Sequence, residues 1–101
     1  MARQTRGFLV RWREFMVWCD ERGWEIMNLP PNAGPYLEAR WRAVIAETPC
    51  IVMLYTQGEK KSEEHGRVHI TGVPPGEPTL RLMKALHRDL RDTDILAFKF
   101  R

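Results

Sequence analysis

The stretch Tyr36–Thr56, with the sequence YLEARWRAVIAETPCIVMLYT, decides the fold because its first half fits two structures. A helix over Tyr36–Ala46 would gather four apolar residues on one face, namely Leu37, Trp41, Val44 and Ile45. A strand would instead gather five residues by alternation, namely Leu37, Ala39, Trp41, Ala43 and Ile45. Alanine, glutamate and arginine favour helix, and prolines stand near both ends. We therefore predict a helix here and keep the strand as the alternative.

The second half of this stretch and the flanking segments supply the other elements. Cys50–Thr56 is a continuous apolar run of β-forming residues, which predicts a strand. Gly23 stands where a glycine often ends a helix. Outward from the deciding stretch we predict a helix over Thr5–Arg22, strands over Trp24–Leu29, Arg67–Val73 and Asp94–Arg101, and a helix over Thr79–Arg91. Loops are predicted at Pro30–Pro35, Gln57–Gly66 and Pro74–Pro78.

This order predicts one α+β domain over residues 1–101. A ferredoxin-like βαββαβ unit with an antiparallel sheet would follow an extra N-terminal helix. If Tyr36–Ala46 is a strand, the expected fold is instead an α-β(5)-like sandwich. In the ferredoxin-like arrangement Cys50–Thr56 would be an edge strand although it is the most apolar one. A long apolar edge invites pairing, which favours a homodimer or coverage by the first helix.

Composition excludes several classes of protein. The 101 residues are 44% hydrophobic with a net charge of +3, which is too apolar for a disordered chain. Charged residues interrupt the apolar stretch Phe8–Cys19, so it fits neither a membrane span nor a signal peptide. We therefore expect a cytoplasmic protein that does not bind a membrane. Cys19 and Cys50 are expected to be buried thiols.

The helix predicted over Thr79–Arg91 has a basic stripe opposite its apolar one. The basic residues follow helical spacing: Arg81, Lys84, Arg88 and Arg91. Cations about one turn apart can follow a phosphate backbone. Arg40 and Arg42 would add two more from the predicted second helix. The first hypothesis is therefore a small non-enzymatic module that binds nucleic acid, either DNA or RNA.

The first helix suggests an alternative function. Val10 and Val17 stand seven residues apart, and with Trp18 they lie off the main apolar face of the predicted helix. Such a patch is typical of a surface that binds a protein partner or a second copy of the chain. On this alternative the chain is an inhibitor or adaptor of the kind found in phages and mobile elements.

A third hypothesis starts from the stretch CIVMLYTQGEKKSEEHGRVHITGV, Cys50–Val73. It resembles the strand–loop–strand of the two-histidine (HUH) nucleases that initiate rolling-circle replication, which also use a ferredoxin-like sheet. Their motif holds a metal with His-hydrophobic-His, and a tyrosine on a later helix attacks DNA. Here the triplet is His69-Ile70-Thr71, and no tyrosine follows Tyr55, so the second ligand and the nucleophile are missing. The resemblance implies at most a degenerate relative. Because His65 and His69 lack further ligand residues, we expect no metal. The sequence also has no glycine-rich phosphate-binding motif and no serine or cysteine with a spaced histidine partner, so we expect no cofactor and no enzymatic activity.

Overall fold

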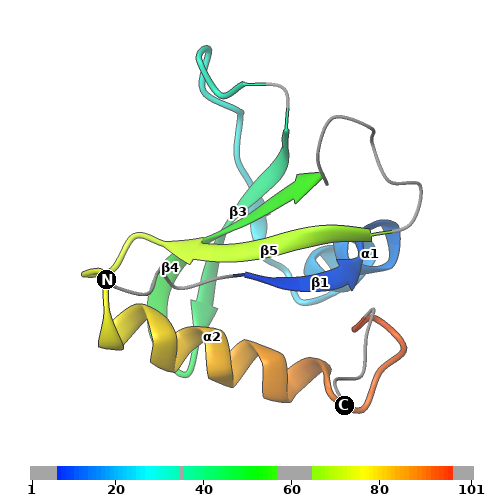
Figure 1. Cartoon of the computed structure of the whole chain (residues 1–101), viewed down its shortest axis with the longest axis vertical. Coiled ribbons are helices and arrows are strands. Elements are labelled where there is room, and N and C mark those ends of the chain that lie inside the picture. The colour runs from blue at the N-terminus through cyan, green and yellow to red at the C-terminus, as the bar shows by residue number, and fades with distance from the viewer. Residues whose placement is uncertain (1–6, 35, 57–64, 97–101) are drawn as a thin grey trace, which may run out of the picture.

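The computed structural model describes residues 7–34, 36–56 and 65–96, which form one five-stranded antiparallel sheet and two helices (Figure 1). In chain order the elements are β1 (Phe8–Arg11), α1 (Trp12–Glu21), β2 (Glu25–Ile26), β3 (Leu37–Ile45), β4 (Thr48–Thr56), β5 (His65–Thr71) and α2 (Glu77–Leu90). The strand order in the sheet is β1-β5-β4-β3-β2, so α1 connects the two edge strands. The α+β class is thus confirmed. The predicted ferredoxin-like order after an N-terminal helix is not found, because the described chain begins with a strand and the sheet order differs.

The segment that decided the prediction is a strand. The helical and extended patterns differ most clearly at Val44, which a helix would bury and a strand would expose. Val44 is 57% exposed, whereas Ala39 and Ala43 are each 3% exposed. β3 pairs with β4 from Ile45 opposite Thr48 onward, across a two-residue turn. The predicted helix over Tyr36–Ala46 is therefore wrong. Pairing and burial against β4 outweigh the local helix propensity, and the alternation was the correct pattern.

The first predicted helix is correct only in its second half. Residues 8–11 form the edge strand β1, which pairs with β5, and α1 begins at Trp12. Residues 5 and 6 lie outside the described part of the chain. The predicted end is confirmed: Gly23 has a φ of 80°, and the Trp24 N–H donates to the Cys19 carbonyl at 3.3 Å. The strand predicted over Trp24–Leu29 shortens to the two residues of β2.

The most apolar strand, β4, lies in the centre of the sheet and not at its edge. β3 and β5 pair with its two sides, so β4 is not the exposed edge strand that was the reason to expect a dimer. The predicted elements over Arg67–Val73 and Thr79–Arg91 are found as β5 and α2 with shifted ends. Of the strand predicted over Asp94–Arg101, the structure shows a single bridge between Leu96 and Val10, and residues 97–101 lie outside the described part.

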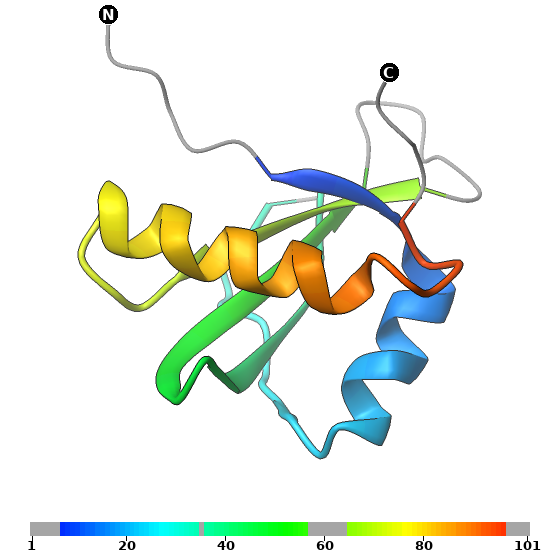
Figure 2. The ribbon, with the colours of Figure 1, turned by 90° about the horizontal axis from the view of Figure 1, so that it is seen from below.

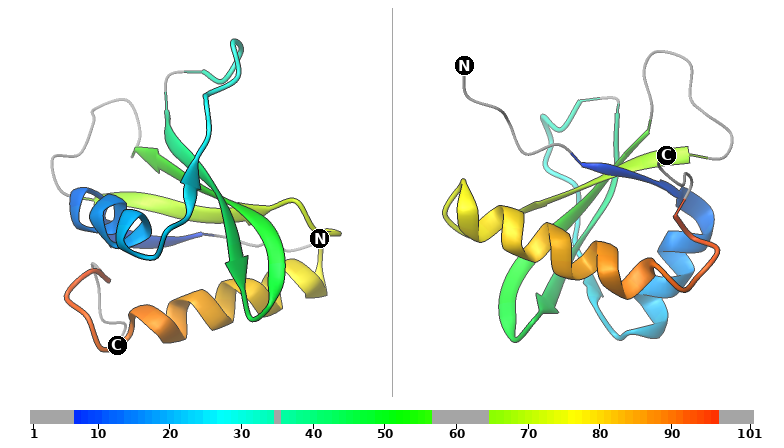
Figure 3. Two further views of the ribbon diagram at one scale, coloured as in Figure 1. Left: turned by 180° about the vertical axis from the view of Figure 1, so that it is seen from behind. Right: turned by 60° about the horizontal axis from the view of Figure 1, so that its bottom comes forward.

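The sheet and the helices form two layers, with α2 lying across the sheet and α1 beside it (Figure 2). The residues between the layers alternate along the strands and follow one stripe of each helix. The largest fully buried side chains include Phe15, Leu54, Ile70, Leu86 and Leu90. Gly66 allows both β4 and α1 to approach β5 closely, because a Cβ there would lie 2.8 Å from the Tyr55 carbonyl oxygen and 3.2 Å from the Trp12 Cβ. The opposite side of the sheet carries no helix among the described residues (Figure 3).

Candidate functional site

The outer side of α2 carries the basic residues that the sequence singled out. The buried residues of this helix include Leu82, Leu86 and Leu90, which face the sheet. The four predicted cations lie on the opposite side and are all exposed. Arg91 follows the last helical residue but keeps helical dihedral angles, with a φ of −63° and a ψ of −33°. We call this set the α2 cation row: Arg81, Lys84, Arg88 and Arg91.

The side chains of the cation row make no polar contacts with the rest of the described protein. Within the described part of the chain, no ion pair or side-chain hydrogen bond involves any of its four residues. The neighbouring acid Asp89 points instead to α1, where its carboxylate lies 3.9 Å from the Arg22 guanidinium. At 1.5 Å per residue, the row is about 15 Å long. It is a straight line of free positive charge on a helix that the core holds in place.

Arg40 and Arg42, which the sequence grouped with these cations, lie on the other side of the molecule. They alternate in β3 with Ala39, Trp41 and Ala43, which face the helices. Both also have partners. Nε and Nη2 of Arg40 donate to the Asn28 carbonyl at 3.0 and 2.8 Å. Nε of Arg42 lies 3.6 Å from Oε1 of Glu25. The six basic residues predicted as one site therefore form two separate sets.

The predicted partner patch on the first helix is not assembled. Val10 belongs to β1 and is 0% exposed. Trp18 is half-buried: its ring stacks on Phe15 at 5.9 Å between centroids and meets Trp24 edge-on at 5.5 Å. Val17, with 57% exposure, is the one member of the predicted patch at the surface. A single exposed valine needs no binding partner to explain it.

A second surface, the helix-free side of the sheet, is not evident from the sequence because it depends on the strand order. Along β4, an apolar stripe of Ile51, Met53 and Tyr55 runs down the middle of this side. The strands on each side of the stripe carry arginines, and β5 also carries a histidine. We call this set the open face: Ile51, Met53 and Tyr55 of β4, Arg67 and His69 of β5, and Arg40 and Arg42 of β3.

The cross-strand register fixes the neighbours within the open face. Met53 pairs with Arg40 on one side and with His69 on the other. Tyr55 pairs with Arg67, whose Nη1 donates to the Gly7 carbonyl at 3.1 Å. The Tyr55 hydroxyl donates to the Met53 sulfur at 3.5 Å. The burial of His69 lowers the pKa of its imidazole below the usual 6.5. The open face is thus an ordered surface in which the arginines are held in position.

The two histidines considered as metal ligands do not converge. His65 and His69 both belong to β5 and are four residues apart, which separates them by about 13 Å along an extended strand. Zinc ligands must each approach the metal to about 2.0–2.1 Å. Within the described residues, no group of three or more His, Cys, Asp or Glu side chains could hold a metal ion. The geometry therefore gives no support to a metal site at this pair.

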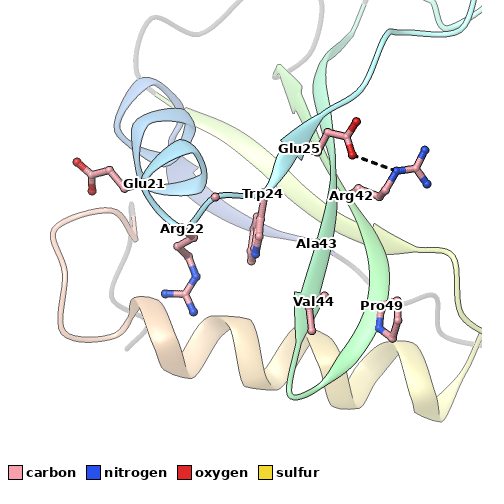
Figure 4. Close-up of a pocket in the computed structure, with 9 residues that line it drawn as sticks. Glu21, Arg22, Trp24, Glu25, Arg42, Ala43, Val44 and Pro49 are labelled. Atoms are coloured by element: carbon pink, nitrogen blue, oxygen red, sulfur yellow. Dashed lines mark ion pairs between the residues drawn. The ribbon is translucent and has the colours of Figure 1, made fainter.

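A concave region of about 800 Å³ lies where α1, β2 and β3 meet (Figure 4). Arg22, Trp24 and Val44 line it together with the Glu25–Arg42 ion pair. Arg22 lies over the ring of Trp18 at 4.4 Å and over that of Trp24 at 5.7 Å. The region opens to solvent, and both of its arginines are already engaged. Glu21 also lines the region, and its side chain has no ion pair or hydrogen bond among the described residues. A single exposed carboxylate does not indicate a particular ligand.

The two cysteines are buried, as the sequence predicts. Burial raises the pKa of the Cys19 thiol far above its usual range, and it also raises the pKa of the Cys50 thiol. Both groups therefore stay protonated and behave as small apolar side chains.

Comparison with protein-family models finds no match for the chain, and comparisons with curated proteins and with solved structures find none either. Among the described residues, neither helix has the length and apolar character needed to cross a membrane.

Proposed function

We propose that the protein binds nucleic acid through the α2 cation row. The observation that supports this proposal is the contrast in partners. The four cations of the row have no ion pair or side-chain hydrogen bond within the described chain, whereas Arg22, Arg40, Arg42 and Arg67 are each engaged. Free cations at a fixed spacing neutralise phosphates without first breaking internal contacts.

The geometry of α2 suits a sugar–phosphate backbone better than base recognition. The row lies on the outer side of one straight helix, and the exposed apolar residue beside it is Leu80. Contacts from arginine and lysine to phosphates fix the position of a protein on a duplex and carry no sequence information. The binding we propose is therefore sequence-tolerant and includes duplex DNA and duplex RNA.

The number of cations sets the expected salt dependence. Each phosphate neutralised on a duplex contributes about −0.9 to the slope of log K against log salt. Four contacts predict a slope of about −3.6, so the affinity should fall about 150-fold between about 50 and about 200 mM salt. Non-specific binding of this kind is weak, with a Kd in the range of about 10⁻⁴ to 10⁻⁶ M at physiological salt.

The test is fluorescence anisotropy of labelled DNA and RNA duplexes, with salt titrations of three proteins. The Arg81→Ala/Lys84→Ala/Arg88→Ala variant keeps one cation of the row, so its slope should fall to about −0.9. The matched control is Arg11→Ala/Arg40→Ala/Arg42→Ala, which removes the same charge from the opposite side of the sheet and should keep the parent slope. An unchanged slope in the α2 variant, or equal losses in both variants, would contradict the proposal.

A further inference from the structure

The open face combines an apolar centre with charge on both sides. Ile51, Met53 and Tyr55 follow one another on β4, so the apolar stripe is about 13 Å long at 3.3 Å per residue. The strands to either side lie about 4.8 Å away. Arg40 and Arg42 on β3 therefore stand about 10 Å from Arg67 and His69 on β5, with the stripe between them.

These dimensions match one kind of partner. An α-helix with its side chains is about 10–12 Å wide, and 13 Å corresponds to between two and three turns. If the apolar side of such a helix lay along β4, the residues on either edge of that apolar side would lie over β3 and β5. Acidic residues at those positions would meet Arg40 and Arg42 on one side and Arg67 on the other. We propose that the open face docks an acidic amphipathic helix of a partner protein.

The arginines of the open face are suited to this role because they are held in place but remain charged. Arg40 uses two N–H groups on the Asn28 carbonyl, and Arg67 uses one on the Gly7 carbonyl. A guanidinium has five N–H donors, so both keep free donors for a carboxylate. Neither carbonyl cancels the charge. Holding these long side chains before binding lowers the conformational entropy lost on docking.

A single-stranded nucleic acid fits the open face less well. Its phosphates run along one side of its bases, so one of the two cationic strands would have no partner. Sheets that bind single strands stack successive bases on several aromatic rings. On the open face Tyr55 is the one aromatic residue beside the aliphatic Ile51 and Met53. Methionine adapts well to the apolar side of a helix.

The acids next to the open face leave its charge positive. Glu25 pairs with Arg42 at 3.6 Å across exposed side chains, with 72% and 64% exposure, so an incoming carboxylate can displace it. Glu38 is the bulged residue between Leu37 and Ala39 at the start of β3. Against the three arginines of the open face, Glu25 and Glu38 leave one net positive charge.

The test uses two labelled peptides of about 18 residues, a length at which an isolated helix becomes stable. Both have leucines on one side. The first has glutamates at the flanking positions, and the second has lysines there. Anisotropy with the full chain should show the glutamate peptide binding at least roughly tenfold more tightly than the lysine peptide.

A substitution in the apolar stripe tests whether the peptide binds to the open face. Met53→Glu should weaken binding of the glutamate peptide roughly tenfold or more, and Met53→Leu should keep it within about twofold. Met53 is partly buried and lies outside the core between the layers, so circular dichroism should show both variants folded. The triple α2 variant should bind the peptide like the parent, which separates this test from the one for nucleic acid.

Three results would overturn the proposal. The first is equal affinity for the two peptides. The second is binding of the glutamate peptide that does not change in Met53→Glu. The third is that the glutamate peptide does not bind, while either an oligothymidine binds in a Met53-dependent way or the chain forms a dimer that Met53→Glu dissociates. The last case would assign the open face to a single strand or to a second copy of the chain.

Discussion

The outer side of α2 and the open face are both basic, but they differ in what their cations contact. On α2, four cations form a line with no ion pair or side-chain hydrogen bond inside the described chain. On the open face, Arg40 and Arg67 are fixed by backbone carbonyls, and apolar side chains separate the two basic strands. The number of charges is similar. The partners of each charge and the residues between them distinguish the surface that we propose to bind phosphates from the surface that we propose to dock a protein.

The fixed spacing of the cation row requires α2 to be anchored by the hydrophobic core. Substitution of Leu86 should have the largest effect on this anchoring. Leu86 is 0% exposed, so Leu86→Ala should lower the free energy of unfolding by about 2–5 kcal/mol. The matched control is Leu80→Ala on the same helix, where Leu80 is 43% exposed and the change should stay within about 0.5 kcal/mol. Urea denaturation measures both. Similar losses for the two variants would mean that α2 does not pack as described.

The turn between β3 and β4 allows the sheet to be changed without touching α2. Ala46 and Glu47 have φ angles of 50° and 65°, although neither is a glycine. Two-residue hairpin turns with positive φ at both positions favour Asn-Gly. The variant Ala46→Asn/Glu47→Gly should therefore raise the free energy of unfolding by about 1–2 kcal/mol.

Duplex binding by this turn variant should stay close to that of the parent, because no hydrogen bond or ion pair joins the turn to the cation row among the described residues. A lower denaturation midpoint would contradict the assigned turn. A changed duplex affinity would show that the two surfaces are coupled.

Helix α2 and the β3–β4 hairpin also show how much of the fold could be predicted from the sequence. The stripe of α2 and the apolar run of β4 were predictable because each follows from local periodicity or composition. The strand Leu37–Ile45 was not predictable in the same way. Its composition favours a helix, its apolar residues alternate as in a strand, and only the pairing with β4 decides between the two. The strand Phe8–Arg11 was also missed, because its hydrogen-bond partner β5 lies more than fifty residues away along the chain.

The candidate site was predictable to the same extent as the local structure. The four cations of α2 share one helix, so helical spacing alone brings them together. Arg40 and Arg42 were assigned to the wrong surface because their segment was predicted as a helix. The open face could not be predicted, because it requires knowing that β3, β4 and β5 are neighbours. The alternation of Arg67 and His69 with Val68 and Ile70 was the available signal for one of its strands.

The open face should also respond weakly to pH through His69. Burial lowers the pKa of this imidazole in the folded state, so the unfolded chain binds more protons in the acidic range. Stability should therefore decrease slightly as the pH falls from about 7.5 to about 5.5. His69→Gln should reduce this decrease, as measured by urea denaturation at several pH values. Identical pH dependence in the parent and the variant would show that His69 is not desolvated on this face.

The most direct test of the difference between the two surfaces is a nuclear magnetic resonance titration of the ¹⁵N-labelled chain. The duplex is added first, and the glutamate peptide is added second to the same sample. We expect the duplex to shift amide signals of α2, from about Arg81 to Arg91, and the peptide to shift signals of β3, β4 and β5. Shifts caused by the duplex on the three strands, with α2 unchanged, would contradict the assignment of the two surfaces.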